Sequence, residues 1–144
     1  MLSAYLFDQR QGENVAAWAD ALHGLTGSQV LWLDLLDASA AEELEVKDAL
    51  GLEDLDICGD GREKPALTQR ADYLEVTAVC VVETEDGSPA QPAAINCFVG
   101  KNWVVTSHNV ELALVDEFRE RTEGQGDIGD SMHRRFSPRF LDRW

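Results

Sequence analysis

The 144-residue sequence contains no long apolar run, and this absence excludes membrane-spanning proteins of the helical type. No stretch approaches the roughly 20 apolar residues that a helix needs to cross a bilayer. The first ten residues, MLSAYLFDQR, lack the basic segment, apolar segment and cleavage site of a signal peptide. We therefore expect a soluble protein of the cytoplasm that makes no membrane contact itself.

Basic residues are also scarce. Twelve lysines and arginines stand against 27 acidic residues, which gives a formal net charge of −15. Nucleic-acid affinity comes largely from basic side chains that displace counterions from phosphates, so this chain should bind no nucleic acid. An anionic membrane would be repelled for the same reason. The charge favours cations or basic partners, and an acidic surface that only confers solubility is the simpler alternative.

Cysteine is represented three times, by Cys58, Cys80 and Cys97, without a CxxC motif. An odd number of cysteines in a cytosolic chain favours reduced thiols over disulfides. Because Cys80 and Cys97 lie within strand-like apolar runs, we expect both to be buried, reduced and free of metal. The alternative is that these two lie nearly opposite each other across a hairpin and bind a metal together with a distant histidine.

Motifs of enzyme active sites are missing as well. The chain has neither the G-x-S-x-G nucleophile elbow nor a phosphate-binding P-loop. Ser107 and His108 are adjacent, but neighbouring residues on a strand point to opposite faces, so they do not form a nucleophile and its base. Instead, His108 or Asn109 is expected to cap the helix that follows. The sequence therefore predicts no catalytic residues and no enzyme.

The sequence does contain a regular series of strand and helix patterns. Apolar and β-branched runs predict strands at about residues 2–7, 29–36, 73–84, 93–100 and 103–108. Helical spacing of apolar residues predicts helices at about residues 14–23, 39–50 and 110–122. The second helix has the clearest ends, because Ser39 and Glu42 form an S-x-x-E capping box and Gly51 is a suitable C-cap.

This order of elements predicts an α/β fold in one domain. The last three strands follow one another through turns as a meander, and helices precede and follow them. A mixed, largely antiparallel sheet between helical layers accommodates this order. We expect the domain to span residues 1–130. Residues 131–144, with four arginines and one acid, are predicted to be a basic tail or the start of a truncated helix.

An acidic loop lies between the second helix and the meander. Its four carboxylates, those of Glu53, Asp54, Asp56 and Asp60, fall within eight positions, and the loop is rich in glycine. Carboxylate oxygens are the hard ligands that Mg²⁺ and Ca²⁺ take in proteins. The spacing is not that of an EF-hand, so the loop offers no complete cage, and a solvated acidic loop is the simpler alternative.

Four segments of the chain follow one another in the order of one known family. VLWLDLLDASAAEELEVKDALGL resembles its tryptophan-led strand and capped helix, and DGREKPALTQRADYLEVTAVCV resembles its Q-R-P-K loop and the strand after it. GKNWVVTSH resembles its GKNFLVTVH hairpin, and VDEFRERTEGQG resembles the helix with an R-E-R phrase. Over roughly residues 30–126, the chain resembles the N-terminal cytoplasmic domain of the CorA-like magnesium and divalent metal ion transporter family.

The resemblance implies an α/β/α sandwich and a function. The chain would be a cytoplasmic regulatory or metal-sensing domain of a transporter of Mg²⁺ or another divalent cation, without the membrane pore. Its partners would be divalent cations and other subunits of a homo-oligomer, which is a pentamer in the full-length family. The cation is left open among Mg²⁺, Zn²⁺, Co²⁺ and Ni²⁺. The alternative is a free-standing soluble protein-interaction domain of the same fold.

The same resemblance implies where a metal would bind. Counted back from Pro65 without a gap, Asp56 falls on the glutamate of the family's sensing loop, and Ile57 falls on its second acid. Asp56 is therefore the expected ligand, with Asp54 and Asp60 as its neighbours. In this family the other carboxylates come from the long helix of a neighbouring subunit. The resemblance thus implies weak binding of Mg²⁺ or another divalent cation by this chain, and a monomer or weak dimer in solution.

Overall fold

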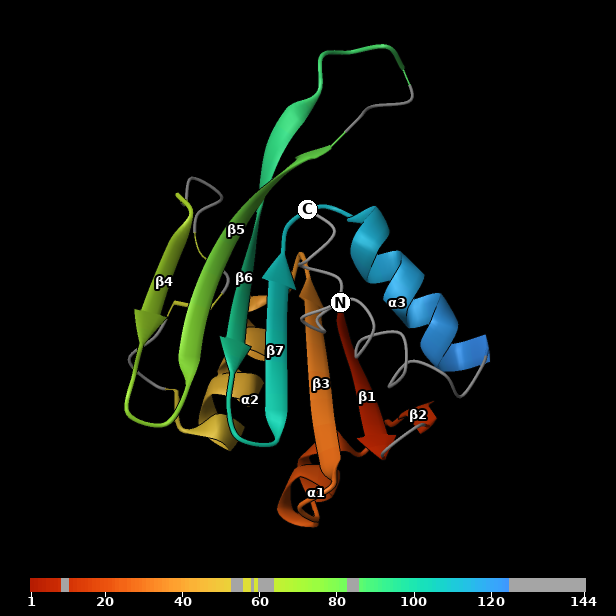
Figure 1. Ribbon diagram of the computed structural model, residues 1–144, viewed down its shortest axis with the longest axis vertical. Coiled ribbons are helices and arrows are strands. Elements are labelled where there is room, and N and C mark those ends of the chain that lie inside the picture. Colours follow the sequence, from red (N-terminus) through yellow and green to blue (C-terminus); the bar gives the residue numbers. More distant parts are fainter. Residues whose placement is uncertain (9–10, 53–55, 58, 60–63, 83–85, 125–144) are drawn as a thin grey trace, which may run out of the picture.

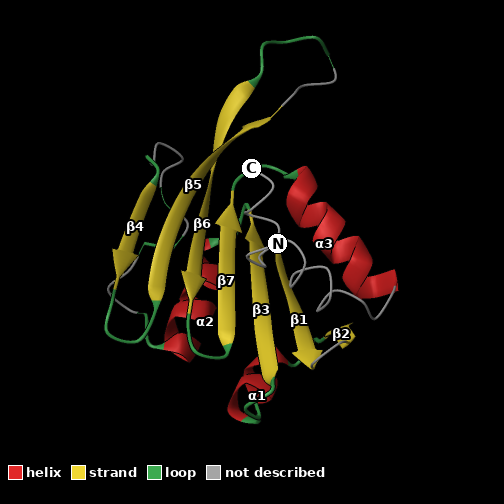
Figure 2. Cartoon of the chain, viewed as in Figure 1, coloured by secondary structure: helices red, strands yellow, loops and turns green. Residues whose placement is uncertain are grey.

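The computed structural model describes residues 1–8, 11–52, 56–57, 59, 64–82 and 86–124. This part of the chain contains seven strands and three helices (Figure 1, Figure 2). The strands are β1 (Leu2–Asp8), β2 (Gln11–Asn14), β3 (Gln29–Leu36), β4 (Ala66–Gln69), β5 (Leu74–Val82), β6 (Gln91–Val99) and β7 (Trp103–His108). The helices are α1 (Trp18–His23), α2 (Ala40–Leu50) and α3 (Ala113–Gly124). The predicted domain boundary between residues 130 and 131 lies outside the described residues.

All seven described strands belong to one sheet, in the order β2-β1-β3-β7-β6-β5-β4. Only the central pair, β3 and β7, is parallel; every other neighbouring pair is antiparallel. The meander β5-β6-β7 has the predicted connections. Because β7 returns to lie beside β3, the chain brings these two segments, distant in sequence, together in the middle of the sheet (Figure 1).

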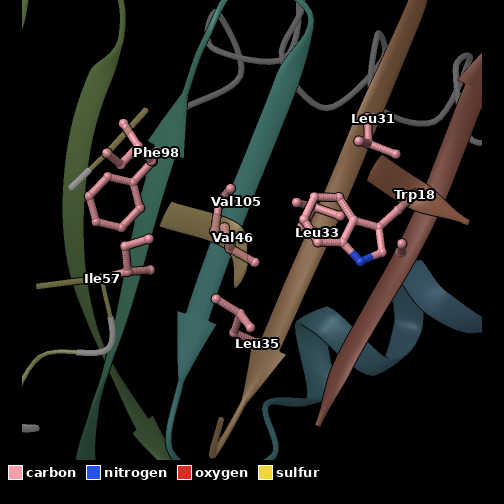
Figure 3. Close-up of a cluster of buried hydrophobic side chains, with 10 residues drawn as sticks. Trp18, Leu31, Leu33, Leu35, Val46, Ile57, Phe98 and Val105 are labelled. Atoms are coloured by element: carbon pink, nitrogen blue, oxygen red, sulfur yellow. The ribbon is translucent and has the colours of Figure 1, made fainter. Parts of the chain in front are cut away.

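The apolar core lies on one face of this sheet. Leu31, Leu33 and Leu35 alternate along β3, so their side chains share this face, where Val46 of α2 and Trp18 of α1 pack against them (Figure 3). Phe98 of β6, Val105 of β7 and Ile57 also belong to the cluster, as do Ala4 and Leu52. The opposite face carries α3, which reaches β3 through the contact between Arg119 and Asp34. The predicted α/β fold, a mixed and largely antiparallel sheet between helical layers, is confirmed.

Helix α2 is held at both ends by the residues that the sequence indicates. The Ser39 hydroxyl accepts a hydrogen bond from the Glu42 N–H at 3.2 Å, and Glu42 Oε1 accepts one from the Ser39 N–H at 3.1 Å. The second carboxylate oxygen of Glu42 accepts from the N–H of Leu2 at 2.7 Å, which ties the helix to β1. Gly51 ends the helix in the left-handed conformation, with φ of 70°. The predicted capping box is therefore confirmed.

Several predicted boundaries are wrong. The first helix begins at Trp18 rather than near residue 14, because residues 11–14 pair with β1 as strand β2. The third helix begins at Ala113 rather than residue 110, and residues 109–112 form a connection instead. Strand β4 has no counterpart among the predicted elements. Both missed strands are short edge strands that exist because a neighbouring strand pairs with them.

Candidate functional site

Asp34 is a fully buried carboxylate at the centre of the sheet. It lies between Leu33 and Leu35, whose side chains enter the apolar core, so the alternation along β3 directs Asp34 to the opposite face. Its exposed fraction is 0%. A buried charge is costly unless it is paired and hydrogen-bonded. An acid inside the dense apolar run QVLWLDLL therefore requires partners from elsewhere in the chain.

Three donors satisfy the two oxygens of this carboxylate. Asp34 Oδ1 accepts from the Thr106 hydroxyl at 2.6 Å and from Nε2 of His108 at 2.8 Å. Asp34 Oδ2 accepts from Nη2 of Arg119 at 2.8 Å. The Thr106 hydroxyl in turn accepts from Nε1 of Trp32 at 2.9 Å. We refer to Asp34, Thr106, His108 and Arg119 as the Asp34 network. It joins β3, β7 and α3.

The parallel pairing of β3 and β7 places the strand members of the network. In this register Asp34 lies opposite Thr106, and Leu36 lies opposite His108. Thr106 and His108 are two positions apart on β7, so both point to the face that Asp34 occupies. Ser107, between them, is in register with Leu35 and so belongs to the other face. Ser107 is therefore not a member of the network, and the Thr106 hydroxyl donates its hydrogen to Asp34.

Both ring nitrogens of His108 face hydrogen-bond acceptors. Nε2 contacts the Asp34 carboxylate, and Nδ1 lies 2.7 Å from the carbonyl oxygen of Val110. A carboxylate and a carbonyl accept but do not donate, so both contacts are hydrogen bonds only when both nitrogens carry hydrogen, and the site favours the imidazolium form. Burial is the largest influence and lowers the pKa of His108. The hydrogen bonds to Asp34 and Val110, with the charge of Asp34, outweigh burial and raise this pKa above its ordinary value.

The expectation that His108 or Asn109 caps the third helix is wrong. The His108 ring is 1% exposed and engaged with Asp34, and α3 begins only at Ala113. Sequence reasoning treated this histidine as the polar end of a strand. The signal that could have found the network is the combination of one acid in a buried strand with Thr106 and His108 at alternating positions of another.

Arg119 connects helix α3 to the Asp34 network. Its side chain is 19% exposed, its Nη2 bonds Asp34, and its Nη1 lies 3.8 Å from a carboxylate oxygen of Asp116 on the same helix. Among the described residues, the Arg119 Nε–H is buried without a hydrogen-bond partner. Two cationic groups, Arg119 and the His108 imidazolium, thus share one buried carboxylate, and Asp116 adds a second acid at the edge.

The predicted metal loop is only partly described. Asp54 and Asp60 lie outside the described residues. Asp56 is exposed, and its Oδ1 accepts a hydrogen bond from the N–H of Gly59 at 3.2 Å. Within the described part of the chain, no group of three or more His, Cys, Asp or Glu side chains is placed to hold a metal ion. The prediction that Asp56, Asp54 and Asp60 bind metal is therefore neither confirmed nor contradicted.

Ile57 is a core residue and explains part of this loop's geometry. Its exposed fraction is 0%, and it packs in the core cluster with Val46 and Phe98. Its N–H donates to Oε1 of Glu43 at 3.1 Å, which ties the loop to α2. The position that the resemblance assigns to a second acid is therefore filled by an apolar anchor. Asp56, next to it, is left on the surface.

Cys80 and Cys97 are free thiols but are only half-buried, so the expectation that they are buried is wrong. Both lie on the face of β5 and β6 opposite to Phe98, away from the core cluster. Cys97 pairs with Val76 and Cys80 pairs with Ala93, so the two thiols are not opposite each other across the hairpin. Burial, followed by the charge of Asp34, raises the pKa of Cys97 to about 11. That thiol stays protonated at neutral pH and is a poor metal ligand.

The described helices include none that is long and apolar enough to span a membrane.

Comparison with known protein families identifies the family of this chain. Residues 27–143 match the family described as CorA-like Mg²⁺ transporter protein. The chain belongs to this family. The matched region runs from the start of β3 through α3, so it includes every member of the Asp34 network and the acidic loop. The resemblance inferred from the sequence is thereby confirmed.

Several solved structures share the fold of this chain. The soluble domain of CorA from Methanocaldococcus jannaschii is 14% identical with a TM-score of 0.63, over 82% of this chain and 45% of that one. The full-length CmaX protein is 19% identical with a TM-score of 0.68, over 87% and 39%. The ZntB cytoplasmic domain from Vibrio parahaemolyticus RIMD 2210633 is 10% identical with a TM-score of 0.60, over 91% and 54%.

The chain therefore spans about half or less of the length of these solved structures. Among curated proteins, no match to the chain was found. At these identities the likeness to the solved structures establishes the fold, and family membership rests on the match over residues 27–143.

Proposed function

We propose that this chain is the cytoplasmic regulatory domain of a CorA-like transporter of Mg²⁺ or another divalent cation. The observation that carries the proposal is the family match over residues 27–143. The similar folds of a CorA soluble domain and a ZntB cytoplasmic domain support it. In this proposal the domain lies on the cytoplasmic side of the membrane within a longer polypeptide, and it works together with other subunits of a homo-oligomer.

Fractionation of the native cell tests whether the chain belongs to a membrane-bound polypeptide. An antibody raised against the 144-residue chain is used on separated membrane and soluble fractions. We expect a species well above 15.9 kDa in the membrane fraction. A species of 15.9 kDa found only in the soluble fraction would instead support the alternative, a free-standing protein-interaction domain of the same fold.

We further propose that Asp56, with Asp54 and Asp60, forms half of a cation-sensing site. Asp56 is exposed next to the buried anchor Ile57, so its carboxylate can meet a cation without leaving the core unfilled. Mg²⁺ keeps several of its waters and usually takes one or two protein carboxylates directly. One subunit then supplies few ligands, and a neighbouring subunit supplies the others. Binding by the single chain is weak, with a Kd on the order of millimolar, as in loosely caged extracellular calcium modules.

An NMR titration with Mg²⁺ tests the half-site. We expect shift changes that are largest near Asp56, spread over many acids of the −15 surface and do not saturate below the millimolar range. Asp56→Ala should remove the local changes, whereas Asp48→Ala, an exposed acid on α2, should leave them in place. A saturable micromolar isotherm that Asp56→Ala abolishes would mean that one chain holds a complete site. Local changes that survive Asp56→Ala would rule out Asp56 as a ligand.

A further inference from the structure

We propose that the Asp34 network is a proton-dependent latch, which fixes α3 to the sheet while His108 is protonated and loosens when His108 loses its proton. This inference is independent of the proposed cation site, because it uses no residue of the acidic loop. The ligand is the proton, and the element that responds is the last described helix.

The latch holds α3 at two points. Before the helix, in the connection between β7 and α3, Nδ1 of His108 donates a hydrogen bond to the carbonyl oxygen of Val110. Further along the helix, Arg119 bonds the Asp34 carboxylate that also receives His108 Nε2. One imidazolium therefore supports both points, the first directly and the second through Asp34. Apolar packing adds to these two points, because Val115 of α3 and Leu112 just before the helix are buried, while Leu114 is 53% exposed.

The groups around His108 indicate that the Asp34 network sets its protonation. Its neighbours in the sheet register are Leu36 on β3 and Ile95 on β6, both of which are apolar. The titratable groups around the network are Asp34 and the adjacent Asp37 on the β3 side, Cys97 on β6, Arg119 and Asp116 on α3, and the exposed Glu111 in the connection. The Met1 amino group, which precedes β1, contacts Glu42 and the Leu36 carbonyl. Of these, Asp34 and Arg119 act on His108 directly.

Loss of the proton removes a hydrogen bond from one of the two points. A neutral imidazole has a single N–H, so a ring lone pair then faces either the Asp34 carboxylate or the Val110 carbonyl. An acceptor left unsatisfied in a buried site costs its desolvation energy. If Nδ1 loses its hydrogen, the connection to α3 is released. If Nε2 loses its hydrogen, Thr106 and Arg119 remain as the donors to Asp34 among the described residues.

The direction of the pH dependence follows from the direction of the pKa shift. The pKa of His108 is raised in the folded protein, so the folded, latched state binds the proton more tightly than the released state. The latch therefore contributes fully below the ordinary histidine pKa of about 6.5, and its contribution is lost as the pH rises through the raised value. Each unit by which the pKa is raised corresponds to about a tenfold change in the latch equilibrium.

Two measurements on the unmodified chain test the latch. The ring ¹⁵N shifts of His108 report its protonation across pH 5.5 to 9, a range chosen to lie on both sides of about 6.5. Hydrogen exchange, corrected for its intrinsic pH dependence, reports the protection of α3, with α2 as the internal reference. We expect His108 to titrate above the ordinary value and α3 protection to fall across that midpoint while α2 protection stays constant. Constant α3 protection across the midpoint would overturn the proposal.

Matched variants separate the latch from a merely structural role. His108→Gln should give weak α3 protection at every pH, with no step, because its side chain carries no proton to lose. His23→Gln removes an exposed imidazole on α1 and should keep the full step. A step that persists in His108→Gln would assign the pH dependence to another group and overturn the latch. If His108→Gln does not fold, the two measurements on the unmodified chain still decide the question.

Discussion

At the scale of single residues, the protein is organised around one buried acid. An apolar side chain at the position of Asp34 would need no hydrogen-bond partner. The buried carboxylate, in contrast, is stabilised there by three hydrogen-bond donors. A buried ion pair is weak evidence for stability, since desolvation offsets much of the attraction. Removing only the carboxylate of such a pair is destabilising, because its cationic partner is then left buried without a counter-charge. The network therefore makes the position of α3 depend on one carboxylate.

Asp34→Asn tests this dependence. Asparagine has the same shape but no charge, and its NH₂ group would face donors where a carboxylate oxygen accepts now. We expect the free energy of unfolding to fall by about 3–5 kcal/mol, the usual cost of removing one partner of a buried pair. Urea denaturation followed by circular dichroism measures it. Asp48→Asn, an exposed change on α2, should stay within about 0.5 kcal/mol. A loss below about 1 kcal/mol for Asp34→Asn would show that the network is easily replaced.

At the scale of elements, the tight turn between β6 and β7 aligns the centre of the sheet. The Gly100 N–H donates to the Trp103 carbonyl at 2.9 Å, and the Trp103 ring lies over the glycine. Trp103 also packs against the core cluster. The ring can cover the turn because Gly100 has no side chain. This turn positions the start of β7, and the register of β7 against β3 then brings Thr106 and His108 to Asp34.

Gly100→Ala should destabilise this turn. A Cβ there would lie 2.2 Å from Cε2 of Trp103, so the ring must move out of its packed position. We expect a loss of about 1–3 kcal/mol, typical of overpacking. Gly27→Ala is the matched control, because its Cβ would meet nothing within 4 Å. Equal unfolding free energies for Gly100→Ala and the unmodified chain would mean that the Trp103 ring repacks without cost.

At the scale of the whole molecule, charge opposes self-association of this chain. Copies that each carry a net charge of −15 repel one another at low ionic strength. The chain also spans only 45% of a CorA soluble domain and 39% of the full-length CmaX protein. The resemblance places the contacts that hold a pentamer together in a long helix and a membrane part, and neither is among the described elements.

We therefore expect the 144-residue chain to be a monomer or weak dimer at micromolar concentration. Light scattering over a dilution series should give a mass near 15.9 kDa. Repeating the series in about 1 M salt, where the screening length falls to about 3 Å, should raise the dimer fraction if charge is what opposes association. A stable pentamer in either buffer would show that this domain assembles alone.

Local patterns in the sequence were sufficient for many of the elements. The dense apolar run at residues 29–36 and the β-branched run at 103–108 became β3 and β7 with the predicted ends. Ser39, Glu42 and Gly51 marked both ends of α2. These signals act within a few residues, through side-chain alternation, local hydrogen bonds and the left-handed conformation of glycine, so a single sequence displays them.

The candidate site was decided by the tertiary structure. Asp34 meets Thr106, His108 and Arg119 across 72, 74 and 85 residues of chain, and only the parallel pairing of β3 with β7 and the docking of α3 bring them together. The edge strands β2 and β4 likewise have no pattern of their own and depend on the strand beside them. The sequence by itself determined the acidic charge, the apolar strands and the caps, since those follow from residue identity and local spacing. The protonation of His108 depends on which acceptors surround it, and that is a property of the folded chain alone.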